Sequence, residues 1–240
     1  MKSNFERFLY FEIQKMSWFT DTLQSSLGKK LLMALTGLFL IIFLITHLAG
    51  NLQLLKGADA KLDFNAYALF MTSFPPIKAV SYLLYASILG HAIYGLMLTL
   101  QNKKARPVQY AMSKPDTNSA WSSRNMGILG TMILIFLIIH MKSFWYEMHW
   151  GTLALDANGN KDLHAVTVAA FSQAWYVILY VIAMVALGFH LIHGFSSAFQ
   201  SLGWNHPKYT PLVKTIGFGI AVIIPALFAL IPIVMLLQNK

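Results

Sequence analysis

Five long apolar runs limit what this chain can fold into. A helix needs about 20 apolar residues to cross the core of a bilayer. Hydrophobic residues make up 57% of the 240-residue chain and charged residues only 11%, against roughly 25% charged in soluble domains. We therefore predict an all-α fold, a single membrane domain over 1–240. Its transmembrane spans are expected at about 30–55, 77–100, 125–148, 172–199 and 212–237.

The distribution of Lys and Arg predicts how the spans are oriented. The segments that precede the first span, join the second to the third and join the fourth to the fifth hold 12 of the 18 Lys and Arg residues. Because such residues accumulate on the cytoplasmic side, the N-terminus is expected in the cytoplasm and the C-terminus outside. Residues 1–27 mix apolar and charged side chains, which predicts a cytoplasmic segment rather than a cleaved signal peptide. The net charge of +9 follows from this bias and does not indicate a nucleic-acid partner.

Histidines on four of the five spans are the main functional signal. At about 1.5 Å per residue, His47 and His140 lie roughly 24 and 21 Å above the cytoplasmic ends of the first and third spans. His91 and His190 lie roughly 13 Å above the cytoplasmic ends of the second and fourth. Equal depth therefore predicts two pairs: an outer pair, His47 and His140, and an inner pair, His91 and His190.

Two imidazoles at one depth on different helices are the ligands that a bis-histidine haem needs, one on each side of the iron. We therefore predict two b-type haems, whose filled coordination restricts them to electron transfer. Small residues such as Gly50, Gly90 and Gly95 would let a porphyrin approach the backbone. The chain has no cysteine, which excludes an iron–sulfur cluster and covalent haem attachment within it.

Other interpretations of the histidines remain open on the residues alone. A single histidine within the membrane is often only hydrogen-bonded across the bundle. A proton relay usually needs carboxylates, and here Asp and Glu lie in the tail, in loops or at a span end. A structural metal site is disfavoured because the two pairs differ in depth by about 9 Å.

Several motifs resemble a known family across nearly the whole chain. They are Thr36-Gly-Leu-Phe-Leu40, Thr46-His47-Leu48, Gly90-His91-Ala-Ile-Tyr-Gly95, and Phe189-His190 followed by Gly194 and Ser201-Leu-Gly-Trp204. Their order and spacing resemble the five-helix, dihaem cytochrome b subunit of succinate:quinone oxidoreductases, the succinate dehydrogenase and fumarate reductase family. The resemblance implies that the first and third helices ligate the distal haem and the second and fourth the proximal haem.

The resemblance also distinguishes His190 from His193. The family's ligand stands four residues before a glycine, here Gly194, so His190 is expected to bind iron. His193 is then expected to bond a haem propionate or a neighbouring helix. Some members carry a glutamate two residues before this ligand as a transmembrane proton path. That position is Gly188 here, which excludes this path.

The function implied by the resemblance is electron transfer between succinate and a membrane quinone, commonly menaquinone, in a bacterial inner membrane. A flavoprotein subunit and an iron–sulfur subunit would be the partners, and the complex could assemble into a higher oligomer. The same chain could carry electrons in either direction. Two alternatives are the cytochrome b subunit of a hydrogenase or formate dehydrogenase and, from a different class, a histidine-lined transporter without haem.

Polar residues at the span ends are candidates for the remaining contacts. Quinone reduction consumes protons, so its site needs polar groups near a water-accessible face of the membrane. Arg124 is the preferred partner for a haem propionate because a guanidinium pairs bidentately with a carboxylate. Lys30, Trp121, Ser123, Ser197 and Gln200 are further candidates for propionate or iron–sulfur-subunit contacts on the inner side. The quinone-site candidates are Asn51, Gln53, Asp63, Trp145, Glu147 and His149.

Overall fold

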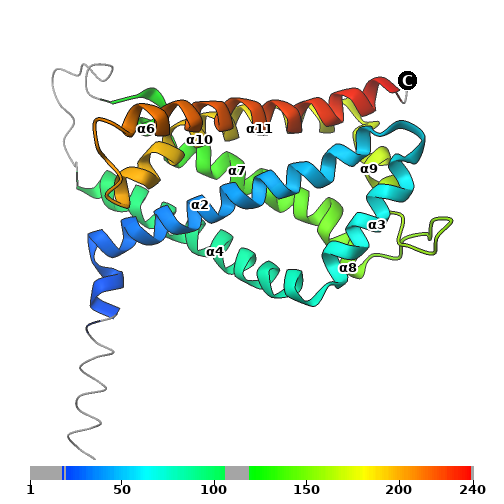
Figure 1. Ribbon diagram of the computed structural model, residues 1–240, viewed down its shortest axis with the longest axis horizontal. Helices are drawn as coiled ribbons and strands as arrows, with labels where there is room; N and C mark the ends of the chain where they lie inside the picture. Colours follow the sequence, from blue (N-terminus) through cyan, green and yellow to red (C-terminus); the bar gives the residue numbers. More distant parts are fainter. Residues whose placement is uncertain (1–17, 19, 106–118, 239–240) are drawn as a thin grey trace, which may run out of the picture.

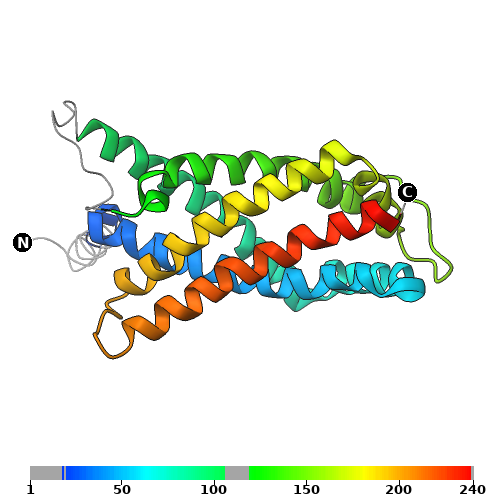
Figure 2. The same ribbon diagram turned by 90° about the horizontal axis from the view of Figure 1, so that it is seen from above.

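The computed structural model describes residues 18, 20–105 and 119–238. Long helices lie side by side along its longest axis (Figures 1 and 2). The predicted N-terminal segment 1–27 falls mostly outside the described residues, as does most of the loop between the second and third spans.

Five helices among the described residues are long and apolar enough to cross a membrane, which confirms the predicted all-α, five-span fold. Each begins and ends within four residues of its predicted limits. The third combines α7 (Met126–His140), a π-helical segment (Met141–Tyr146) and α8 (Glu147–Trp150). The others are α2 (Ser26–Asn51) with a 3-10 turn (Leu52–Leu55), α4 (Pro75–Lys104), α10 (Ala174–Ser201) and α11 (Thr210–Gln238).

Local sequence explains several helix limits. The Ser25 hydroxyl accepts a hydrogen bond from the Gly28 backbone N–H and caps α2. Pro75 begins α4, where its missing N–H costs nothing. Pro225 and Pro232 lie inside α11, which continues through both as one helix. Both prolines are buried against the rest of the bundle.

Short elements gather at one end of the bundle, beside α8 (Figure 1). A 3-10 turn (Gly57–Asp59) leads into α3 (Ala60–Ser73), and α9 (Leu163–Phe171) precedes α10. These elements lie between the predicted spans, where the sequence has no long apolar run. Residues 156–159 form a turn, closed by a single antiparallel bridge between Leu155 and Lys161. A short helix, α6 (Trp121–Arg124), lies at the opposite end.

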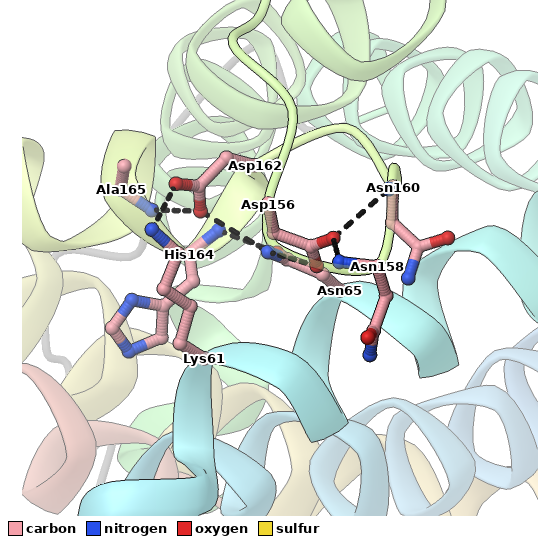
Figure 3. Close-up of polar contacts among 8 residues, drawn as sticks. All are labelled: Lys61, Asn65, Asp156, Asn158, Asn160, Asp162, His164 and Ala165. Carbon is pink, nitrogen blue, oxygen red and sulfur yellow. Dashed lines mark hydrogen bonds and ion pairs between the residues drawn. The ribbon is translucent and has the colours of Figure 1, made fainter.

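A buried amide joins this turn to α3. Asn65 is 0% exposed, and its Nδ2 donates to Asp156 Oδ2 and Asp162 Oδ1, both at 3.1 Å. Its Oδ1 accepts from the backbone N–H of His164 at 2.9 Å (Figure 3). The other Asp162 oxygen pairs with Lys61 at 2.7 Å. This network fixes the loop between the third and fourth spans onto α3.

The helix pair α10 and α11 forms the most extensive contact among the spans. A Cβ added at Gly188 would lie 3.1 Å from the carbonyl oxygen of Ala221, so the two backbones approach each other there. The ring of Phe195 packs against Gly217 of α11, where an added Cβ would lie 2.5 Å from Cδ1 of Phe195. Membrane helices associate through such small residues because lipid offers no hydrophobic driving force between them. A glutamate at position 188, which the sequence already lacks, would not fit against α11 without moving it.

Candidate haem sites

The outer pair joins α2 to α7. The imidazole centroids of His47 and His140 lie 5.7 Å apart and their planes are nearly perpendicular, at 89°. Aromatic rings surround both: Phe43 and Phe228 contact His47, and Phe144 contacts His140. An apolar, aromatic environment of this kind favours a large flat ligand.

The inner pair joins α4 to α10. The centroids of His91 and His190 lie 6.2 Å apart, with an interplanar angle of 63°. Both pairs are therefore those that equal depth predicts. His193, three residues after His190 on α10, is half-buried, and it is the His190 ring that packs against His91.

The ring spacing fits a shared metal. If each imidazole nitrogen lies about 2 Å from the metal and about 1 Å from its own ring centre, the two centroids are about 6 Å apart. The observed values of 5.7 and 6.2 Å agree with this spacing. Each site offers only two histidines, and no group of three or more His, Cys, Asp or Glu able to hold an ion occurs in the described part of the chain. An iron whose other ligands come from a porphyrin fits this donor set.

The polar contacts of two histidines also suit metal ligation. Tyr180 Oη lies 2.9 Å from Nδ1 of His140, and Thr36 Oγ1 lies 3.1 Å from Nδ1 of His91. A ligating histidine usually gives its second ring N–H to such a partner, which leaves Nε2 for the metal. In contrast, the buried Nδ1 of His190 has no hydrogen-bond partner among the described residues.

Glycines leave room beside the inner pair. A Cβ at Gly37 of α2 would lie 3.3 Å from Cε1 of His91, and one at Gly130 of α7 would lie 3.9 Å from Cε1 of His190. Gly90 and Gly194 face open space, with nothing within 4 Å of an added Cβ. Gly50, expected to admit a porphyrin near His47, is instead filled by the ring of Tyr67.

These contacts also show how far apart the two histidine pairs lie along the bundle. His91 lies at the level of Gly37, ten residues before His47, and His190 lies at the level of Gly130, ten residues before His140. Ten residues correspond to roughly 15 Å along a helix, more than the predicted 9 Å. The spans begin at different levels, so counting residues from a span end underestimated the separation.

Arg124, the predicted propionate partner, lies at the end of α6, beside the inner part of the bundle. It donates a hydrogen bond to the backbone carbonyl of Ser119. It also lines an open groove of about 390 Å³ between α4 and α7, with Thr99, Gly127 and Thr131. The α7 wall of this groove continues to Gly130, which faces His190. Arg124 is the cation among the residues that line this groove, and a guanidinium suits a carboxylate such as a propionate.

The other inner-side candidates are more scattered. The exposed Trp121 packs its ring on Phe189, the neighbour of His190, at 5.3 Å. Gln200 lines a small separate pocket of about 140 Å³ near the loop that joins α10 to α11. Lys30 is exposed, and Ser123 and Ser197 are half-buried.

The quinone-site candidates fall into separate groups. The Nε1–H of Trp145 donates to Tyr85 Oη at 2.8 Å, and the Trp145 ring lies 4.6 Å from that of His149. Glu147 pairs with Lys142 at 2.7 Å, and Asp63 pairs with Lys56 at 2.6 Å.

Asn51 and Gln53 lie nearer to the outer pair. Asn51 Nδ2 lies 3.4 Å from both ring nitrogens of His47, and Gln53 is half-buried in the turn that follows. Asp63 is therefore an exposed ion pair, whereas Asn51 and the cluster of Trp145, His149 and Tyr85 offer polar edges to a ligand.

Sequence reasoning predicted no histidine contact for four residues, of which Thr36 and Gly37 belong to a quoted motif: Thr36, Gly37, Gly130 and Tyr180. One signal was present. Glycine stands ten residues before the histidine on both the first and the third span, at Gly37 and Gly130. A residue ten positions away lies almost three helical turns lower, the level of the inner pair.

Comparison with known proteins does not add to this assignment. No protein-family model, curated protein or solved structure matches the chain.

Proposed function

We propose that this chain is the membrane-anchor, dihaem cytochrome b subunit of a succinate:menaquinone oxidoreductase. The observation that carries the proposal is the pair of histidine couples, each spaced as two axial ligands of one metal and each on two different spans. The motifs at these histidines, and their order along the chain, support the choice of family.

In this proposal each histidine couple holds one haem b, a group that accepts and releases single electrons. The iron–sulfur subunit docks on the cytoplasmic side, close to the inner pair. His91 and His190 hold the first haem, and His47 and His140 hold the second. The roughly 15 Å between the sites along the helices lets this chain carry electrons across much of the membrane.

Quinone chemistry is proposed at the outer end, near His47 and His140. Quinone reduction needs proton donors that reach water. Asn51 borders His47, and Trp145, His149 and Tyr85 form a polar cluster at the end of the third span. These side chains bind and orient the quinone head group. Asp63 and Glu147, the other acidic candidates, are each held in an ion pair with a lysine.

A cytochrome b subunit of a hydrogenase or formate dehydrogenase is the second candidate, and a histidine-lined transporter without haem is the third. The couples on four separate spans favour the succinate dehydrogenase arrangement over the second. Their metal-like ring spacing and the near absence of carboxylates in the spans disfavour the third.

The test is reduction of the haem by succinate. The chain is purified from its native membrane in mild detergent with whatever subunits accompany it, and absorption is followed anaerobically. Succinate should reduce the haem, and malonate, a competing dicarboxylate, should prevent this. Haem reduced by dithionite but not by succinate would point to another dehydrogenase. A preparation without haem would sink both cytochrome proposals.

A further inference from the structure

Two of the spans that carry histidines each contact a histidine of the other pair. α2 carries His47 of the outer pair, yet its Thr36 contacts His91 of the inner pair. α10 carries His190 of the inner pair, yet its Tyr180 contacts His140 of the outer pair. In each case the contacting hydroxyl lies ten or eleven residues from the histidine on its own helix.

The Thr36 contact has a defined direction. Thr36 Oγ1 donates its only hydrogen to the backbone carbonyl of Leu32, at 2.6 Å, a bond typical of threonine within a helix. Its oxygen can then only accept, so the proton between Thr36 and His91 belongs to Nδ1 of the imidazole. This selects the tautomer of His91 whose Nε2 carries a lone pair.

The Tyr180 contact is held by packing. Tyr180 is 6% exposed, and its ring lies edge-on to Phe136 at 4.8 Å and to Phe171 at 5.0 Å. The phenol oxygen therefore has a fixed place, 2.9 Å from Nδ1 of His140. When Nε2 of His140 binds a metal, the proton of the ring lies on Nδ1. This N–H then donates a hydrogen bond to the Tyr180 oxygen.

We propose that Thr36 and Tyr180 are positioning residues, each of which fixes the ring and tautomer of a ligand in the haem site opposite to that of its own helix. The inference rests on the proposed function, since it requires haem at both couples. An accepted Nδ1–H bond increases electron donation from the imidazole and lowers the potential of the bound iron. Removal of either hydroxyl therefore raises the potential of one haem only, the one whose ligand it contacts.

The experiment compares variants of the full complex by redox titration and by electron paramagnetic resonance (EPR) of the oxidised haems. The two haem signals are first assigned by their loss in His140→Ala and in His190→Ala. Tyr180→Phe should shift the signal and raise the potential of the outer haem, and Thr36→Val should do so for the inner haem. Thr36→Ser keeps the hydroxyl, so the EPR signal and the potential of the inner haem should be those of the wild type.

Tyr176→Phe is the matched control for Tyr180. Tyr176 is buried one turn earlier on α10 and its ring lies 5.0 Å from that of Tyr180, but it is the hydroxyl of Tyr180, and not that of Tyr176, that lies against Nδ1 of His140. The Tyr176→Phe substitution should leave the EPR signals and potentials of both haems unchanged.

Tyr180→Phe spectra like those of Tyr176→Phe, or a shift on the haem of the variant's own helix, would overturn the inference. If Tyr180→Phe does not accumulate, Thr36→Val and Thr36→Ser decide the same question. Wild-type complex without haem would instead contradict the proposed function itself.

Discussion

The imidazole planes of His47 and His140 cross at 89°, with their centroids 5.7 Å apart. Neither ring can rotate freely, because Phe43 stacks on His47 and Tyr180 bonds His140. The first and third spans thus present a pair of fixed, crossed imidazoles to the space between them.

Crossed planes predict different EPR signals for the two haems. Ligand planes near 90° make the dxz and dyz orbitals of low-spin ferric iron nearly equal in energy, which increases the largest g-value. The outer haem, at 89°, should therefore have a larger maximal g-value than the inner haem, at 63°. The larger signal should disappear in His140→Ala. Its survival there, with loss of the smaller signal, would refute the assignment.

Gly37 should control occupancy of the inner site. A Cβ there already lies 3.3 Å from the His91 ring, so a longer side chain must displace that ring. Gly37→Leu should reduce haem content by about one haem per chain, measured as pyridine haemochrome. Gly219→Leu is the control, because an added Cβ at Gly219 meets nothing within 4 Å. Equal haem content in the two variants would show that Gly37 does not border a haem.

Asn65 should contribute to thermal stability. Asn65→Ala removes three hydrogen bonds from a fully buried position and leaves two aspartates without their shared donor. We expect the melting temperature in detergent to fall by about 5 °C or more. Asn158→Ala is the comparison, since the side chain of Asn158 is exposed and only its backbone N–H contacts Asp156. Similar melting temperatures for both variants would mean that the network is not a stabilising element.

The network around Asn65 should stabilise the protein less at low pH. Burial raises the pKa of the Asp162 carboxyl. Hydrogen bonds from Lys61 and Asn65 lower this pKa by more than burial raises it, so the net pKa lies below the ordinary 3.8. A carboxyl with a lowered pKa stabilises the folded state above its ordinary pKa, and this contribution is lost as pH falls through the lowered value.

Wild-type protein should therefore lose melting temperature below about pH 4. The loss should be steeper than in Asp162→Asn, where this carboxyl is gone. Parallel curves for the two proteins would exclude a role for Asp162.

Hydropathy was enough to predict the five spans, because bilayer thickness sets their length and few other structures tolerate such apolar runs. The histidine pairing also followed from depth, since any consistent error shifts both members of a pair equally. The distance between the pairs did not, because the spans begin at different levels and a residue count from each span end does not register this.

The rest depended on contacts between distant parts of the chain. Asn65 meets Asp156 and Asp162, which follow it by 91 and 97 residues, and no local pattern predicts that α3 and the turn at 156–159 meet. Tyr180 is one aromatic residue among many in an apolar run. Its role depends on the rotation of α10 relative to α7, which the low polarity of both helices leaves unspecified.

The most direct test of the account is the haem content of the purified chain and two variants. The account predicts two haems b per wild-type chain, one in His190→Ala and two in His193→Ala, because the His190 ring, and not that of His193, packs against His91. Wild-type chain without haem, or a His190→Ala variant that keeps both haems, would contradict it.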